Sequence, residues 1–337
     1  MLKNFFLISL NSFALCVSIF AQDSSAKTIR AGMIGLDTSH VPVFVGILNN
    51  PKAEGDVAGI KVVAGYPGGT DMPASKDRVA KFTEAVHAKG VELVDSIPRL
   101  LEKVDVVMLE SVDGRIHLEE ATQVIKAGKP LWIDKPIAGS LAEALVIFEL
   151  AKQHHVPVFS SSSLRFGAEI QGLRNSAELG AVTGAATWGP CSSSPGMPDL
   201  FFYGIHGVEP LYTLMGPGCQ TVTRAVSPQV DYVTGVWKDG RVGTYRGIRK
   251  GKASMGAMVF GTNAILPVAK AGDYNDLCRE IAKFFKTGTA PVSADETIEI
   301  FAFMEAADES KRQNGAPVAL ADVLAKAKAE AAARLKE

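Results

Sequence analysis

The sequence predicts an α/β protein with an N-terminal doubly wound parallel sheet of Rossmann type and a C-terminal α+β domain with a mainly antiparallel or mixed sheet. Three observations predict this class. Short apolar runs alternate with helical patterns over residues 28–160, strands dominate over residues 220–268, and 337 residues suffice for about two domains.

The composition of the chain argues against two classes of protein, nucleic-acid-binding proteins and polytopic membrane proteins. Apolar residues make up 47% and charged residues 21% of the chain, which is typical of a globular protein. The 35 basic and 36 acidic residues nearly cancel, so the basic surface that a nucleic-acid-binding protein needs is not expected. A polytopic membrane protein is excluded because no second apolar run of membrane-spanning length follows the N-terminus.

The first 21 residues, MLKNFFLISLNSFALCVSIFA, are typical of a secretory signal peptide. Lys3 precedes an apolar run from Phe5 to Phe20, and Ala21 is small enough to precede a cleavage site. We expect cleavage between Ala21 and Gln22 and a periplasmic or secreted protein. An uncleaved membrane anchor is the alternative.

The first domain is predicted from buried apolar runs that alternate with amphipathic helices. Strands are expected at 28–35, 60–65, 91–94, 104–109, 130–133 and 156–160, and helices at 43–48, 77–89, 97–103, 117–126 and 141–154. Strands that alternate with helices at this spacing predict a parallel sheet covered on both faces.

The pattern changes after residue 160. Helices are expected at 168–179, 204–215, 273–286, 294–313 and 319–336, and a strand at 182–188. Asp239-Gly240 predicts a hairpin turn in the strand-rich region. We therefore divide the chain into a signal peptide (1–21), a dinucleotide-binding domain (28–160), a substrate and oligomerisation domain (161–290) and C-terminal helices that fold back on the first domain (291–337).

Polar residues follow four predicted strands, and in a doubly wound sheet such strand ends bind ligands. The four segments are 34–40, 110–117 (which opens with Glu110-Ser111-Val112-Asp113), 134–136 and 163–166. Cysteines carry little information. Of the four cysteines, Cys16 lies in the predicted signal peptide. Removal of that peptide leaves Cys191, Cys219 and Cys278, an odd, sparse set without metal-ligand spacing, so no metal site is expected, and whether Cys191 and Cys219 pair stays open.

Several segments resemble the Gfo/Idh/MocA family of glucose–fructose oxidoreductases and inositol dehydrogenases. The stretch AGKPLWIDKPIAGSLAEA is similar to the family pattern A-G-K-x-V-x-x-E-K-P-x-A-x-[ST]-x-x-E-A, with Asp134 in place of Glu. GIHGVEPLYTLMG is similar to the family's active-site helix. The resemblance covers residues 28 to about 290. It implies an NAD(P)-dependent oxidoreductase that acts on a sugar, polyol or glycoside hydroxyl and forms dimers or tetramers. The balanced charge and the lack of a second long apolar run predict that the protein binds neither nucleic acid nor, after signal cleavage, a membrane.

The resemblance also implies site residues. Lys135 and His206 would be the catalytic pair, in which the imidazole takes a hydroxyl proton and the lysine stabilises the alkoxide. The cofactor would contact Gly35, Leu36, Asp37, Ser39, His40, Ser111, His117, Asp134, Lys135 and Pro136. The substrate would contact Arg165, Trp188, Tyr203 and Glu209. Purely structural roles are the alternatives. They are a surface lysine (Lys135), a helix cap or start (His206, His117), an N-cap and a packed ring (Asp37, His40), a bridge between the domains (Arg165) and a core side chain (Trp188).

The chain departs from the family at the phosphate-binding loop. In the G-x-G-x-x-G pattern Gly35 matches the first glycine, but Asp37 and His40 replace the other two. A side chain at the second glycine obstructs the pyrophosphate, and a carboxylate adds repulsion of about 3 kcal/mol at ~5 Å and an effective dielectric of ~20. The acid expected to hold the ribose is replaced by Tyr66-Pro67-Gly68-Gly69, with Asp71 nearest.

The active-site helix departs too, since Phe202 and Glu209 replace the aspartates of D-x-G-x-H-x-x-D. Three functions therefore stay open. They are an NAD(P)-dependent oxidoreductase, a redox-neutral enzyme that keeps a tightly bound nicotinamide cofactor for elimination or hydrolysis, and a non-enzymatic sugar-binding protein that has lost the cofactor. A search for bound dinucleotide separates the two enzymes from the binding protein.

Overall fold

The computed structural model describes residues 28–174 and 176–336, so the predicted signal peptide lies outside the described residues. The first domain is a six-stranded parallel sheet in the order β3-β2-β1-β4-β5-β6. Its strands are β1 (Ile29–Ile34), β2 (Ile60–Tyr66), β3 (Glu92–Leu93), β4 (Val106–Leu109), β5 (Leu131–Asp134) and β6 (Val158–Ser161). The predicted Rossmann-type sheet is confirmed, and its strand order reverses between β1 and β4.

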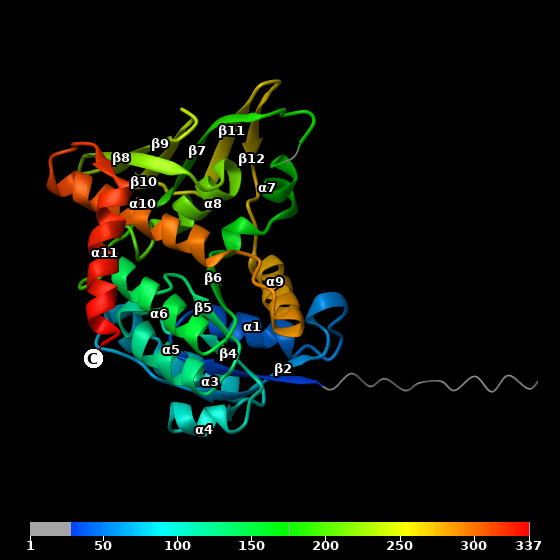
Figure 1. Cartoon of the computed structure of the whole chain (residues 1–337). Helices are drawn as coiled ribbons and strands as arrows, with labels where there is room; N and C mark the ends of the chain where they lie inside the picture. Colours follow the sequence, from blue (N-terminus) through cyan, green and yellow to red (C-terminus); the bar gives the residue numbers. More distant parts are fainter. Residues whose placement is uncertain (1–27, 175, 337) are drawn as a thin grey trace, which may run out of the picture.

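Helices cover both faces of this sheet (Figure 1). They are α1 (His40–Leu48), α2 (Pro73–Lys76), α3 (Val79–His87), α4 (Ile97–Leu101), α5 (His117–Lys126) and α6 (Leu141–Gln153), with 3-10 turns η1 (Gly55–Val57) and η2 (Gly114–Ile116). Local sequence sets the start of α6, because the Ser140 hydroxyl accepts a hydrogen bond from the amide of Glu143 at the N-terminus of the helix. None of the described helices is both long and apolar enough to cross a membrane.

The second domain is a seven-stranded mixed sheet in the order β12-β11-β7-β10-β9-β8-β13, in which only the β7–β10 pair is parallel. Its strands are β7 (Val182–Pro190), β8 (Cys219–Val226), β9 (Val230–Trp237), β10 (Val242–Ile248), β11 (Gly256–Gly261), β12 (Ile265–Val268) and β13 (Val318–Ala319). The elements η3 (Ser163–Arg165), α7 (Ala168–Leu173) and α8 (Ile205–Met215) lead into it, and α7 is shorter than predicted.

Helix α8 packs closely on one face of the second sheet. A Cβ atom at Gly207 would lie 2.1 Å from the Tyr245 ring, so only glycine allows this approach. Three further helices follow: α9 (Tyr274–Thr287), α10 (Ala294–Arg312) and α11 (Leu320–Arg334). Helix α11 packs against α6 of the first domain, where Arg334 pairs with Glu143.

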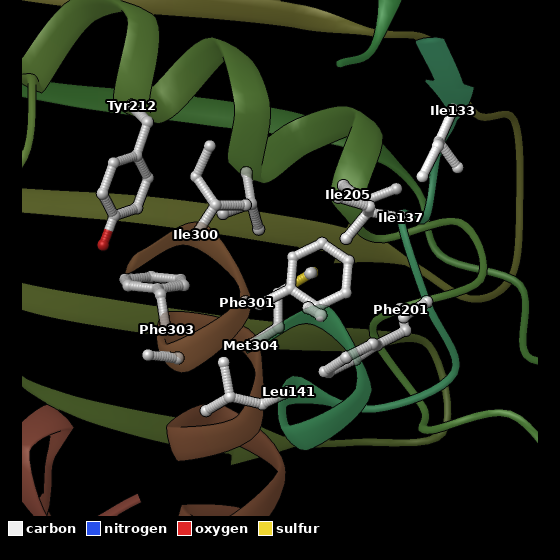
Figure 2. Close-up of a cluster of buried hydrophobic side chains, with 14 of the residues drawn as sticks. Ile133, Ile137, Leu141, Phe201, Ile205, Tyr212, Ile300, Phe301, Phe303 and Met304 are labelled. Carbon is white, nitrogen blue, oxygen red and sulfur yellow. The ribbon is translucent and has the colours of Figure 1, made fainter. Parts of the chain in front are cut away.

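Helix α9 corrects the predicted domain boundary. The sequence predicts this helix within the second domain (161–290), yet its apolar face, including Leu277 and Phe284, is buried in the core of the first domain beside β1, α1 and Trp132. Figure 2 shows a second point of contact, where Phe301 and Met304 of α10 lie among Leu141 of α6 and Phe201. One continuous core therefore joins the two domains and fixes the strand ends of the first against α8 of the second.

Candidate active site

The predicted phosphate-binding turn follows β1, and the ends of the neighbouring strands β2 and β4 pack against it. Gly35 has a φ of 79°, and a Cβ atom there would lie 2.2 Å from the Ser111 hydroxyl. The glycine is therefore required by the close approach of the β1 and β4 ends. Leu36 is buried, and its amide donates to the carbonyl of Pro67 in the loop after β2.

Asp37 bridges the point where the strand order reverses. Its side chain is buried and accepts hydrogen bonds from the Ser75 hydroxyl at 2.6 Å and from the amide of Val112, after β4, at 2.9 Å. Burial raises the pKa of this carboxyl, although the two hydrogen bonds oppose the rise. The carboxylate thus crosses the crevice between β1 and β4, where a doubly wound sheet binds its ligand.

The loops on either side of this crevice are also fastened to each other. The Thr70 hydroxyl donates to Asp113 at 2.9 Å, and Arg115 pairs with both Asp113 and the exposed Asp71. Asp71, the nearest candidate for a ribose acid, is therefore held by an arginine. As they stand, these residues fit a dinucleotide poorly, because the buried and hydrogen-bonded Asp37 side chain stands where the glycine pattern lets the backbone approach the pyrophosphate.

Lys135 and His206 come from different domains and lie near enough at this end of the sheet for the lysine charge to act on the imidazole. Lys135 follows β5 and is buried, while His206 lies in the first turn of α8 and is half-buried. Its Nδ1 atom is joined by a 2.8 Å hydrogen bond to the hydroxyl of Ser162, just after β6. Burial, followed by the charge of Lys135, holds the pKa of His206 well below 6.5, so a neutral imidazole lies near a cationic lysine.

His40, Glu110 and Asp134 line the same strand ends. The Nδ1 atom of His40 lies 2.7 Å from Asp134 Oδ2, and the His40 ring contacts Phe44 and Tyr274. Burial alone would raise the pKa of Asp134, but the charges of His40 and Lys135 outweigh it and hold the pKa at about 2.

Among the remaining residues with a predicted cofactor contact, Ser111 and His117 are buried, whereas Ser39 is exposed to solvent. His117 is buried, and its ring nitrogens contact the carbonyls of Ser111 and Ile137, while the Ser111 hydroxyl donates to Glu120. These contacts tie the loop after β4 to α5. Ser39 is exposed, at the start of α1.

The predicted substrate residues fall into two groups. Arg165 and Glu209 are buried and paired at 2.6 Å, and Arg165 also pairs with Glu296 at 2.6 Å. They join η3, which directly follows β6 of the first sheet, to α8 and α10, so the structure gives them a role in fixing the junction of the two domains. Tyr203 is half-buried and meets the His206 ring edge-on, with ring centroids 5.0 Å apart. Trp188 lies on β7 against Gly256 of the neighbouring strand.

Sequence reasoning missed three residues of the site. Ser162 orients His206, Ser75 holds Asp37, and Glu110 lies buried in the crevice without being named as a site residue. Glu110 directly follows a buried strand, which is the one signal that could have singled it out. The cysteines Cys191, Cys219 and Cys278 are free and buried, so Cys191 and Cys219 do not pair.

The fold defines a two-domain protein whose first domain is a Rossmann-type parallel sheet. Residues 72–162 match the profile of the Gfo/Idh/MocA family, described as an oxidoreductase family with an NAD-binding Rossmann fold. No curated protein sequence is significantly similar to the chain.

Solved structures agree with this match. A putative NADPH-dependent oxidoreductase from Desulfitobacterium hafniense is 19% identical, with a TM-score of 0.71 over 89% of this chain and 99% of its own. Scyllo-inositol dehydrogenase from Lactobacillus casei, solved with NAD(H) and scyllo-inositol, is 15% identical, with a TM-score of 0.71 over 88% and 100%. A putative myo-inositol dehydrogenase from Sinorhizobium meliloti is 15% identical, with a TM-score of 0.70 over 87% and 100%. The resemblance to the Gfo/Idh/MocA oxidoreductases is confirmed, by sequence over residues 72–162 and by fold over both domains.

Proposed function

We propose that the protein is an exported enzyme of this oxidoreductase family and acts on a hydroxyl-bearing carbon of a sugar or polyol. The observation that carries the proposal is that Lys135 lies near enough to His206, at the junction of the two domains, for its charge to act on the imidazole. A structural neighbour that binds scyllo-inositol supports a polyol as the substrate class.

The two side chains divide the proton chemistry. His206 is neutral at physiological pH because its pKa is low, so its imidazole accepts the proton of a bound hydroxyl. The Lys135 ammonium stabilises the alkoxide that develops. Its buried position strengthens this electrostatic attraction. Ser162 fixes the imidazole ring through Nδ1 and leaves Nε2 to face the substrate.

A second candidate is favoured by the Asp37 bridge. The family implies a nicotinamide dinucleotide, NAD or NADP, but Asp37 closes the crevice in which it would lie. This observation favours sugar binding without catalysis, because both the dehydrogenase and the redox-neutral enzyme need a bound nicotinamide cofactor. We therefore derive no step through a dinucleotide.

Substrate turnover separates these candidates. The protein is incubated with a panel of sugars, inositols and glycosides, with and without added NAD or NADP, and products are identified by mass spectrometry. Conversion only with added dinucleotide supports dehydrogenation, and conversion without it supports redox-neutral chemistry. Binding of a panel member without conversion under any condition would overturn the enzymatic proposal in favour of a sugar-binding protein.

Dinucleotide binding by Asp37→Gly tests the bridge directly. We expect the wild-type protein to bind NAD and NADP at least tenfold more weakly than Asp37→Gly, because glycine removes both the obstruction and the charge. Asp71→Asn removes a charge from the exposed rim and is the control. Tight binding by the wild type, unchanged in Asp37→Gly, would show that the bridge does not exclude the cofactor.

Export and assembly complete the proposal. The N-terminal sequence predicts removal of residues 1–21, so protein recovered from the periplasm or the medium should begin near Gln22, and recovery beginning at Met1 would contradict export. We also propose a homo-oligomer formed through the outer face of the second sheet, where Tyr232, Val236, Val242 and Phe260 are exposed. Tyr232→Lys should lower the mass measured by light scattering, and an unchanged mass would contradict this interface.

A further inference from the structure

Three buried side chains converge at the carboxyl ends of the first sheet, beside the Asp37 bridge. His40 begins α1, Glu110 directly follows β4 and Asp134 ends β5. One potential ligand atom from each lies within 4.8 Å of the other two. The three residues are 8%, 0% and 1% exposed, so solvent contributes little to their stabilisation.

Glu110 lacks the partners that a buried carboxylate requires. Neither of its oxygens has a hydrogen bond, and no described residue forms an ion pair with it. The groups that act on its charge are Asp134 and Asp37, which repel it, and Lys135, which attracts it. Burying a carboxylate without compensation is costly, because the charge loses its hydration. Buried charges are therefore paired or coordinate a metal.

His40 and Asp134 lie beside Glu110 as a close pair. His40 Nδ1 and Asp134 Oδ2 lie 2.7 Å apart, although neither atom makes a hydrogen bond of good geometry. One ligand atom from each of the three residues lies close enough to the other two to bind a common ion. An unpartnered buried carboxylate beside this pair indicates a missing partner.

We propose that His40, Glu110 and Asp134 bind one divalent first-row transition-metal ion. One imidazole and two carboxylates are the ligands that zinc or manganese takes at bond lengths of about 2.0–2.2 Å. With a neutral imidazole, the two carboxylates balance the charge of the ion. An imidazole ligand disfavours magnesium and calcium, which prefer oxygen ligands alone.

Three protein ligands leave an open coordination position, as catalytic metal sites do. His206 lies near enough for the charges of His40 and Asp134 to act on its pKa, so the ion would be close to the Lys135–His206 pair. The metal site does not rest on the proposed sugar or polyol chemistry. Its test is a binding measurement, and it can succeed or fail independently of any activity.

The test measures metal binding by the full protein after treatment with a chelator. Zinc, manganese and magnesium salts are each added alone and followed by native mass spectrometry, calorimetry and thermal unfolding. The variant Glu110→Gln removes one ligand. Glu120→Gln is the matched control, because Glu120 is a buried carboxylate of the same segment that instead accepts from Ser111 at 2.7 Å.

We expect one zinc ion per chain, weaker binding of manganese, no binding of magnesium, and a higher unfolding temperature with zinc. Glu110→Gln should weaken zinc binding at least 100-fold, and Glu120→Gln should bind like the wild type. If Glu110→Gln does not fold, His40→Gln takes its place with the same expectation. The absence of stoichiometric zinc binding, equal binding by the ligand variant, or binding of magnesium alone would overturn the proposal.

Discussion

The ion-pair network at the domain junction gives a sharp test of how Glu209 is used. Glu209 was a candidate substrate residue, but in the structure it pairs with Arg165 at 2.6 Å, and both side chains are 3% exposed. The change Glu209→Gln keeps the shape of the side chain and removes its charge. If the carboxylate serves Arg165, the change lowers stability. If it serves the substrate, the change weakens substrate binding alone.

The expected magnitude follows from the partners that remain. Breaking a buried ion pair costs about 3–5 kcal/mol when a charge is left uncompensated. Arg165 keeps Glu296 at 2.6 Å, and that carboxylate is 13% exposed, so compensation is partial. We therefore expect Glu209→Gln to lower the free energy of unfolding by about 2–4 kcal/mol. For a chain of this length, this corresponds to roughly 3–6 °C in unfolding temperature.

Thermal and denaturant unfolding measure this loss. The control is Glu330→Gln, because Glu330 pairs with Arg334 at 3.0 Å on an exposed helix surface. A pair of that kind contributes about 0.3–0.5 kcal/mol. A loss below about 1 kcal/mol for Glu209→Gln, or a loss equal to that of the control, would refute the assignment of Glu209 to the domain junction.

Three further predictions concern stability and reactivity. Burial raises the pKa of Glu120 to about 8, so between about pH 5 and 8 the folded state binds one more proton than the unfolded state, and stability falls as pH rises. Glu120→Gln should make this fall shallower by about 1.4 kcal/mol per pH unit in denaturant titrations, and parallel curves would contradict it. Gly207→Ala should cost about 2 kcal/mol or more through its clash with the Tyr245 ring, whereas Gly172→Ala, with open space around it, should not destabilise the protein, and equal unfolding temperatures would contradict this. The three described cysteines are free and buried, so they should react with a thiol reagent only after denaturation, and fast reaction of the native protein would be the contrary result.

The strands and helices of the first domain were predictable because each one has a local signal. Helix α5, for example, runs from His117 to Lys126 as predicted, since a polar loop precedes it and Gly128 follows it. The partner of α9 was not predictable. Its amphipathic pattern indicates that Leu277 and Phe284 are buried, but periodicity does not indicate which sheet they cover.

The site was predictable only in part. Lys135 and His206 stand in motifs, so sequence alone singled them out as a candidate pair. Glu110 and Ser162 stand in no motif, and their importance arises from contacts between residues far apart in sequence, such as the bond from Ser162 to His206. The obstruction by Asp37 was expected from its place in the glycine pattern, whereas its bridge to Ser75 required the structure.

The central claim is that Lys135 and His206 act together on one substrate hydroxyl. The most direct measurement is turnover by Lys135→Ala, His206→Ala and the double variant on the sugar or polyol that the panel identifies. Each single change should lower turnover by about 10²–10⁴-fold, and the double variant should lose little more than the worse single variant, because the two groups act as a unit. Near-full turnover by both single variants, with normal folding, would contradict the account.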